Sequence, residues 1–274
     1  MMELPETIVI TKQANETLNG KKIMHVFNAT KVHRFTFYHG DPQEYGQQLI
    51  GQTIQSAVGY GMFLDLQLTN GAILSLGEGT ILKYGACGDK IPTNYQLLLG
   101  FEDDSFLVLT VSLYGFIGVY TDGIIDEKYH KLNKERISPL DDNYTEDCFY
   151  HLIAESKKNL TAKALLATEQ RIPGVGNGVL QDILFNARIN PKRKVSTLSD
   201  TEKTNLFQSL KMTLKEMVLK GGRDTQSDLY GNNGGYRTIL TSKTWKIPCP
   251  VCGNHIVKES YMGGAVYYCP NCQI

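Results

Sequence analysis

The sequence predicts an α+β protein, with an N-terminal β-sandwich flanked by helices and a helical C-terminal half that ends in a small cysteine-rich ribbon. Residues 22–120 contain short apolar runs separated by turn residues, whereas helical periodicity dominates from residue 145 onward. Two Cys-x-x-Cys pairs close the chain at a spacing that zinc sites use. The 274 residues, 42% of them hydrophobic, suffice for two domains with separate cores.

A helix is predicted over residues 3–19. Pro5 suits its first turn, and Glu3 and Glu6 suit the positive end of the helix dipole. Gly20 is typical of the position after a helix end. Charge at the start of a helix is a sufficient explanation for both glutamates, so this pattern alone assigns them no chemistry.

Seven short apolar runs follow and predict the strands of a β-sandwich or barrel. Hairpin-type turns at residues 69–71 and 102–104 separate neighbouring runs. The runs cover residues 23–27, 35–38, 62–68, 72–76, 95–99, 106–111 and 116–120.

Helical periodicity then predicts further helices and a closing loop. Ser199 and Glu202 form the pattern of a capping box, which opens the last of these helices. Residues 221–236 are rich in Gly, Asp and Asn and lack periodicity, so we expect a loop with freedom to move. The other predicted helices cover residues 145–157, 161–170 and 178–188. The resulting segments are a β-domain (1–121), a polar linker (122–143), a helical domain (144–222), a loop and connector (223–247) and the ribbon (248–274).

The terminal cysteines can surround one metal ion. Each pair lies on a Cys-Pro-x-Cys turn, and the alternating residues between the pairs predict a hairpin. Four thiolates at this spacing suit a tetrahedral Zn²⁺ ion, and such ribbons are folded by their metal. The alternative is a pair of disulfides in a secreted protein. The four residues are Cys249, Cys252, Cys269 and Cys272.

The composition of the chain limits the cellular location and the binding partners that we expect. The sequence has no run of eighteen apolar residues and no secretion signal, so we expect a cytoplasmic protein without membrane contact, in which Cys87 and Cys148 are reduced core thiols. Residues 1–150 carry 11 Lys and Arg against 19 Asp and Glu, whereas residues 151–274 carry 17 against 9. This asymmetry predicts a polyanion-binding surface on the second half; uneven charge without a ligand is the alternative.

The turn at residues 173–177 and the cations after it form a candidate phosphate-binding surface. Asn177 is predicted to cap the next helix, whose first N–H groups can hold a phosphate. Arg188, Lys192 and Arg193 follow, as expected for contacts to a DNA backbone. An ordinary helical hairpin has the same spacing, so spacing alone leaves both interpretations open.

Four motifs lie along the chain in one order: Glu-Leu-Pro-Glu at residues 3–6, Gln-Arg-Ile-Pro-Gly-Val-Gly-Asn at 170–177, Asp-Ile-Leu-Phe at 182–185, and the ribbon. Together they resemble the formamidopyrimidine-DNA glycosylase and endonuclease VIII family. The resemblance implies a base-excision repair protein with a helix–two-turns–helix domain and a zinc ribbon. It also implies that the partner is double-stranded DNA, damaged or abasic, and we expect a nucleoid-associated bacterial monomer.

The resemblance implies covalent chemistry at the N-terminus. In the family the terminal amine, usually of a proline, attacks C1′ of a flipped nucleotide; a Schiff base forms, the base leaves, and elimination nicks the strand. Glu3 then corresponds to the carboxylate that transfers protons, and Glu6 to the second acidic residue of the opening helix. Met2 stands at the proline's place. Translation from Met2 would put its amine there, whereas a retained Met1 would carry the amine one residue too far out.

The resemblance also implies DNA contacts. Lys163 and Asn177 match residues with which members of the family bind DNA, and Lys163 is expected to contact a phosphate. Arg223 and Tyr236 lie where the family has its mobile lesion-recognition loop, and are predicted to contact an extruded base. The alternative for them is a solvated loop before the ribbon.

Several lesion-side residues of the family are replaced. Met62 occupies the position of a lysine in the family's β-hairpin, and Gly264 occupies that of an arginine in its ribbon. Residues 75–78 replace a His-Leu-Gly-Met run, and residues 113–116 lack the arginine of an Arg-Phe pair that wedges into the DNA. One hypothesis is therefore a divergent DNA glycosylase and AP lyase. A second is a non-catalytic binder of damaged or structured DNA. A third is a monofunctional glycosylase in which Glu3 activates water.

Overall fold

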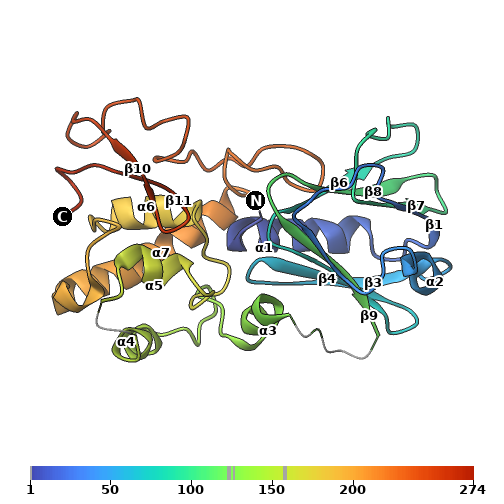
Figure 1. The fold of residues 1–274 in the computed structure, drawn as a ribbon, viewed down its shortest axis with the longest axis horizontal. Coiled ribbons are helices and arrows are strands. Elements are labelled where there is room, and N and C mark those ends of the chain that lie inside the picture. The colour runs from blue at the N-terminus through green and yellow to red at the C-terminus, as the bar shows by residue number, and fades with distance from the viewer. Residues whose placement is uncertain (1, 122–124, 126, 157–158) are drawn as a thin grey trace.

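The computed structural model describes residues 2–121, 125, 127–156 and 159–274. These residues form two lobes, one built of strands and one of helices, and the ribbon lies on the helical lobe (Figure 1). Three predictions touch positions outside the described residues: a retained Met1, part of the linker (122–124 and 126), and the end of the helix predicted over residues 145–157.

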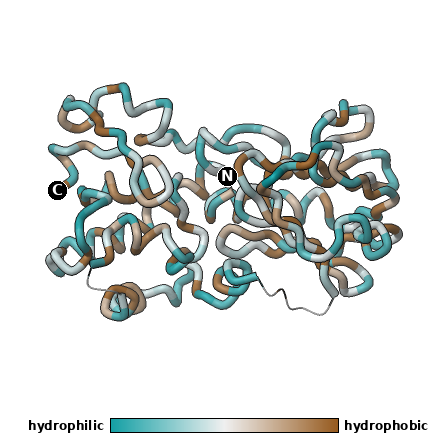
Figure 2. The backbone as a smooth tube through the Cα atoms, viewed as in Figure 1, coloured by the Kyte–Doolittle hydropathy of each residue, from teal (hydrophilic) through white to brown (hydrophobic). Residues whose placement is uncertain are grey.

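Two antiparallel-rich sheets pack face to face in the strand lobe, which confirms the predicted sandwich. One sheet has the order β1-β7-β8-β6 and the other β2-β9-β5-β4-β3, in which only the β2–β9 pair is parallel among the described strands. Buried leucines from both sheets form one core, and Figure 2 follows these hydrophobic stretches along the chain. The strands are β1 (Ile23–Asn28), β2 (Thr36–His39), β3 (Ile54–Tyr60), β4 (Phe63–Leu68), β5 (Ile73–Gly77), β6 (Thr80–Gly85), β7 (Leu97–Phe101), β8 (Phe106–Val111) and β9 (Gly115–Tyr120).

The sequence prediction missed three elements of this lobe. Strand β3 has Gln55, Ser56 and Gly59 between its apolar residues, so no continuous apolar run marks it. Strand β6 is likewise interrupted by a lysine, and the short helix α2 (Tyr45–Leu49) has no clear amphipathic pattern. Both strands are held by pairing with neighbouring strands, and α2 packs on β1.

The predicted linker contains a helix, so that prediction is wrong for residues 128–135. Helix α3 (Lys128–Glu135) packs on the strand lobe through His130 and Asn133, which are each 2% exposed. His130 Nε2 lies 2.6 Å from the hydroxyl oxygen of Tyr60 on β3. The buried face of this helix is polar, and that is why hydrophobic periodicity did not reveal it.

The helical lobe follows the predicted pattern with shorter elements. The capping box of α7 is confirmed, because Ser199 N donates to Glu202 Oε2 at 2.8 Å and Glu202 N donates to Ser199 Oγ at 3.3 Å. Helix α1 (Leu4–Thr17) packs on β3 and on α7, and in Figure 1 it runs along the strand lobe with its N-terminal end toward the helical lobe. The helices of this lobe are α4 (Glu146–Ala154), α5 (Ala162–Ala167), α6 (Val179–Asn186) and α7 (Asp200–Leu219).

The ribbon is the predicted hairpin of β10 (Val257–Tyr261) and β11 (Gly264–Tyr268). It packs on α6 through a small core that includes Phe185. All six cysteines are free, and Cys87 is exposed in a surface loop, so the prediction of a core thiol is wrong there. No helix in the described part of the chain is long and apolar enough to cross a membrane.

The loop over residues 221–236 is confirmed as irregular, but it is anchored on the strand lobe. Leu229 is fully buried in the sandwich core, and its carbonyl accepts a hydrogen bond from Tyr84 N at 2.8 Å. The hydroxyl groups of Tyr230 and Thr17 lie 2.6 Å apart. The loop therefore ties the end of α7 to α1 and β6.

Candidate functional site

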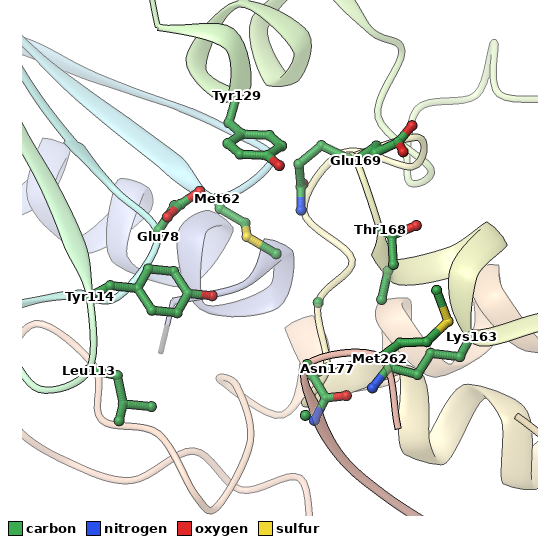
Figure 3. Close-up of a pocket in the computed structure, with 15 residues that line it drawn as sticks. Met62, Glu78, Leu113, Tyr114, Tyr129, Lys163, Thr168, Glu169, Asn177 and Met262 are labelled. Carbon is green, nitrogen blue, oxygen red and sulfur yellow. The ribbon is translucent and has the colours of Figure 1, made fainter. Parts of the chain in front are cut away.

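A pocket of about 480 Å³ lies between the two lobes. Side chains of the strand lobe and of α3 face those of α5, the turn before α6 and the ribbon hairpin across it (Figure 3). The strand lobe and α3 supply Met62, Glu78, Leu113, Tyr114 and Tyr129. The opposite side supplies Lys163, Ala167, Thr168, Glu169, Gln170, Gly176, Asn177, Met262, Gly263 and Gly264.

Glu3 lies beneath the floor of this pocket. It is 2% exposed, and its two carboxylate oxygens accept hydrogen bonds from Gly178 N at 2.9 Å and from Val179 N at 2.7 Å. Gly176 separates Glu3 from the pocket, because a Cβ at Gly176 would lie 2.7 Å from Glu3 Oε1 and 2.8 Å from Met62 Cε. The glycine turn predicted from the sequence therefore permits a close approach, and it brings the N-terminal glutamate to the pocket.

The first N–H groups of α6 thus bind a carboxylate of the chain itself. The predicted Asn177 N-cap is wrong: Gly178 occupies the N-cap position, and Asn177 Nδ2 instead donates to Ala265 O at 3.0 Å. A negative carboxylate at a helix N-terminus is favoured by the helix dipole and by the unpaired N–H groups. Glu3 takes the place that the sequence suggested for a phosphate.

Arg223 joins Glu3 and Glu6 in a buried ionic cluster. Its Nη2 lies 2.6 Å from Glu6 Oε2, its Nε donates to Glu6 Oε1 at 2.9 Å, and its Nη1 lies 3.3 Å from Glu3 Oε2. Burial lowers the pKa of Arg223, but the two carboxylates outweigh burial and the net shift of its pKa is upward. The cluster joins α1 to the loop after α7.

The two loop residues predicted to contact an extruded base lie in the interior. Arg223 is 2% exposed and Tyr236 is 4% exposed. Their backbones pair with each other, and Asp224 N donates to Tyr236 O at 2.8 Å. The sequence did not reveal this burial, because the carboxylates that pair with Arg223 lie more than 200 residues away in the chain. A contact with a base would require this loop to move.

The side chain of Met2 does not line the interdomain pocket, although its neighbour Glu3 lies beneath that pocket. Its side chain is 4% exposed, belongs to the sandwich core with Ile10, and lines a separate pocket of about 170 Å³ together with Glu6 and Thr225. The residue predicted to replace the catalytic proline is therefore held by hydrophobic packing on the strand lobe.

Lys163 and Asn177 meet at the ribbon side of the pocket, close to Gly264. Lys163 Nζ donates to Tyr261 O at 2.6 Å, and burial lowers the pKa of this lysine. A Cβ at Gly264 would lie 3.4 Å from the amide of Asn177. The structure therefore brings together two of the predicted DNA-binding residues and Gly264, which occupies the position of the family's ribbon arginine.

The other predicted cations lie away from this pocket. Lys192 Nζ lies 3.1 Å from a carboxylate oxygen of Glu259, and Arg193 Nη1 lies 2.6 Å from Glu202 Oε1. Arg188 is exposed, and its carbonyl accepts a hydrogen bond from the last residue of the chain. These three residues border the ribbon and do not line the pocket.

From the sequence, Glu78 was only the residue that replaces a methionine of the family, but in the structure it lines the pocket. It occupies the turn between β5 and β6 with a φ of 54°, a left-handed conformation that is costly for a glutamate. Burial, and then the nearby charge of Glu127, raise the pKa of Glu78 to about 7. The pair of glycines around Glu78 is the sequence signal that marks this turn.

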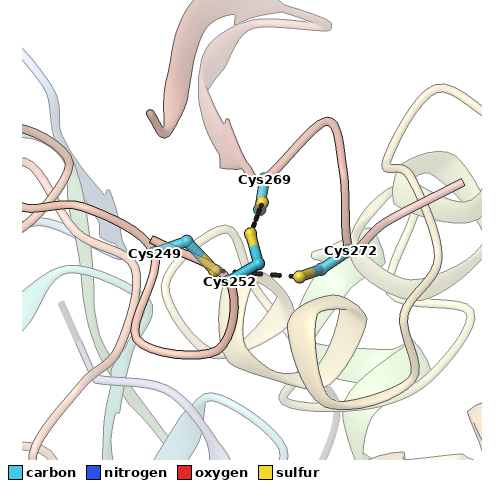
Figure 4. Close-up of side chains that lie close together, drawn as sticks. All are labelled: Cys249, Cys252, Cys269 and Cys272. Atoms are coloured by element: carbon cyan, nitrogen blue, oxygen red, sulfur yellow. Dashed lines mark hydrogen bonds between the residues drawn. The ribbon is translucent and has the colours of Figure 1, made fainter. Parts of the chain in front are cut away.

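The four ribbon cysteines form one cluster. Their Sγ atoms all lie within 4.8 Å of one another, with 3.8 Å between Cys249 and Cys272 and 3.4 Å between Cys252 and Cys269 (Figure 4). Four free thiols at such distances can hold one metal ion, whereas disulfides are not formed. An all-sulfur donor set at the base of a small hairpin is the set that structural zinc sites use.

Comparison with known proteins identifies the chain. Residues 137–228 match the model of the formamidopyrimidine-DNA glycosylase H2TH domain. A formamidopyrimidine-DNA glycosylase of Listeria monocytogenes serotype 4b is 30% identical over 282 residues, which cover 100% of both chains. The chain belongs to the formamidopyrimidine-DNA glycosylase family. The resemblance inferred from the sequence motifs is confirmed.

Solved structures of the formamidopyrimidine-DNA glycosylase family share this fold. The MutM (Fpg) protein of Thermus thermophilus gives a TM-score of 0.81 at 23% identity, over 99% of this chain and 98% of that one. The Lactococcus lactis Fpg in complex with DNA containing an abasic site gives a TM-score of 0.83 at 20% identity, over 99% of both chains. The predicted α+β fold, with its sandwich, helix–two-turns–helix domain and cysteine ribbon, is confirmed.

Proposed function

We propose that this chain is a DNA glycosylase of base-excision repair that acts on damaged or abasic double-stranded DNA in the interdomain pocket. The observation that carries the proposal is the position of Glu3, an acid–base side chain beneath a pocket to which both lobes contribute. Family membership supports the proposal, and so does the Lactococcus lactis Fpg, a structural neighbour that was solved with abasic DNA.

The proposed reaction begins with attack of the chain's terminal amine on C1′ of the damaged nucleotide. The bond from C1′ to the base breaks, the base leaves with a proton, and opening of the sugar gives a Schiff base. Glu3 would transfer the protons. Because Glu3 is 2% exposed behind Gly176 and Met62, the Met62 side chain has to move aside for Glu3 to reach the sugar.

The remaining site residues have supporting roles in this proposal. Lys163 and Asn177 would hold DNA phosphates on the ribbon side, with Arg188, Lys192 and Arg193 extending the basic surface. Arg223 and Tyr236 would reach an extruded base after a loop movement. The cysteine cluster would hold Zn²⁺ and thereby fold the ribbon. We propose that the protein acts as a monomer on the nucleoid.

Borohydride trapping tests the reaction on a duplex with one abasic site. A covalent adduct is expected, with less adduct from Glu3→Gln, and mass spectrometry of the intact chain identifies the residue that carries the amine. A matched duplex with one damaged base in place of the abasic site tests base release. DNA binding without an adduct on the first duplex and without base loss from the second would show a non-catalytic binder. Base release from the second duplex without an adduct or a nick would instead indicate that Glu3 activates water.

A further inference from the structure

Residues 31–39 form a basic and aromatic segment in an otherwise acidic part of the chain. Residues 1–150 carry 11 basic against 19 acidic residues, yet residues 31–39 hold a lysine, an arginine and two histidines without any Asp or Glu. Phe35 and Phe37 are 49% and 56% exposed, and the guanidinium of Arg34 lies 5.4 Å from the centre of the Phe35 ring. Exposed aromatic rings interleaved with cations are typical of surfaces that bind single-stranded nucleic acid.

This segment ends in an aromatic pocket of about 380 Å³. Phe37 and His39 of β2 line the pocket beside Phe116, the parallel-strand partner of Phe37 on β9. The ring of Phe63 meets that of Phe116 edge to face, with 5.8 Å between centroids. Gly118 permits the close packing of these side chains, since a Cβ there would lie within 3 Å of both His39 and Phe116.

Two carboxylates complete the wall of the pocket. Glu78 and Glu127 both line it, from the β5–β6 turn and from the start of α3. Carboxylates repel phosphates but accept hydrogen bonds from N–H groups, which most nucleobases offer on their Watson–Crick edge. A pocket with aromatic faces and acceptor groups therefore suits a nucleobase better than a sugar-phosphate backbone.

The aromatic pocket adjoins the interdomain pocket. Glu78 and Tyr129 line both cavities, so the two share one wall. Lys128 lies at this rim, with its Nζ 6.0 Å from the centre of the Tyr129 ring. A nucleotide in the aromatic pocket would thus continue a DNA strand held between the lobes, with cations close to its phosphates.

We propose that segment 31–39 and the aromatic pocket bind an unpaired stretch of the DNA strand that flanks the interdomain pocket. An unpaired base stacks on the exposed ring of Phe37 with its N–H edge toward Glu78 and Glu127, while Arg34 contacts the backbone. This inference rests on the proposed function for its ligand, DNA, and adds a preference for duplexes with an unpaired flank.

Fluorescence anisotropy with three DNA probes tests this site in the full-length protein. The probes are a blunt duplex with one abasic site, the same duplex with a short unpaired tail, and the same duplex with a tail of abasic residues. The tail with bases should strengthen binding by roughly tenfold, and the abasic tail should not. Phe37→Ala should remove that gain without weakening binding of the blunt duplex, and Arg34→Ala should reduce it.

Phe27→Ala is the matched control, because Phe27 is 47% exposed on strand β1 of the other sheet and lines neither pocket. It should keep the full gain. The inference is overturned if the tail adds no affinity, if the abasic tail adds as much, or if Phe27→Ala and Phe37→Ala act alike. Failure to bind the blunt duplex would count against the proposed function instead, and binding of a single-stranded oligonucleotide, with its loss in Phe37→Ala, would then decide the inference.

Discussion

The carboxylate of Glu3 accepts the backbone N–H of Val179 at 2.7 Å, so a residue at the start of the chain caps a helix 176 positions later. Gly178 N donates to the other carboxylate oxygen at 2.9 Å, and Arg223 closes the cluster from a third segment. The two lobes are therefore joined at the candidate site by buried polar contacts, and changes in this cluster should affect stability as well as activity.

Arg223→Met should destabilise the protein by about 3–5 kcal/mol. The substitution leaves the carboxylates of Glu3 and Glu6 buried without their cation, which costs more than the lost pair contributed. Urea unfolding of the two proteins measures the difference. Arg237→Met is the control, because Arg237 is exposed, and it should change stability by less than about 0.5 kcal/mol. Similar effects of the two substitutions would contradict a role for the cluster.

Gly176→Ala should destabilise the protein by about 1–3 kcal/mol and reduce its activity on abasic DNA. The new methyl group would approach Glu3 Oε1 to 2.7 Å and Met62 Cε to 2.8 Å, so one of these side chains must shift. Thermal unfolding and strand nicking are the measurements. Gly46→Ala in α2 adds a methyl group at 3.5 Å from Ile50 and should be neutral or stabilising. Unchanged activity in Gly176→Ala would show that this approach is not needed.

The features that could be predicted from the sequence are those whose interacting residues lie close together in the chain. The α7 capping box, the hairpin turn at residues 69–71 and the four cysteines each depend on residues that are close in sequence. The Glu3 cap and the Arg223 cluster depend on partners 175 to 220 positions apart, which no periodicity encodes. Helix α3 was missed for a related reason, since its buried face is made of polar side chains with partners in the strand lobe.

Lys163→Ala should weaken DNA binding and lower the slope of log affinity against log salt by about one. Lys163 lines the interdomain pocket, in which the proposed function places the DNA; it is 3% exposed, and its Nζ donates to Tyr261 O at 2.6 Å. Affinities at several salt concentrations give the slope. Lys215→Ala removes an exposed lysine on α7, outside the pocket, and should leave the slope unchanged. A slope that falls equally in both variants would exclude a specific phosphate contact.

Removal of the proposed Zn²⁺ ion should unfold the ribbon and abolish tight DNA binding. The ribbon has only a small core, to which its cysteines themselves belong, so we expect the bonds from a metal ion to the four sulfur atoms, all within 4.8 Å of one another, to supply most of its stability. Elemental analysis should find about one zinc per chain, and Cys252→Ser or a strong chelator should lower that content. The strand lobe should stay folded by circular dichroism. DNA binding at full strength after complete removal of zinc would contradict the proposed role of the metal.

Glu78→Gln should stabilise the protein more at pH 8 than at pH 5. Burial and Glu127 raise the pKa of Glu78 from 4.5 to about 7, so between these values the unfolded chain loses this proton while the folded protein keeps it. The stability that wild-type Glu78 supports therefore falls as the pH rises from 4.5 to 7, and above pH 7 its full charge penalty is present. The neutral amide avoids that penalty and retains the same backbone strain, so the variant should gain about 2 kcal/mol at pH 8, after allowance for partial exposure. Unfolding midpoints of both proteins at pH 5, 6, 7 and 8 measure the difference, and a constant difference across this range would show that Glu78 does not titrate near neutrality.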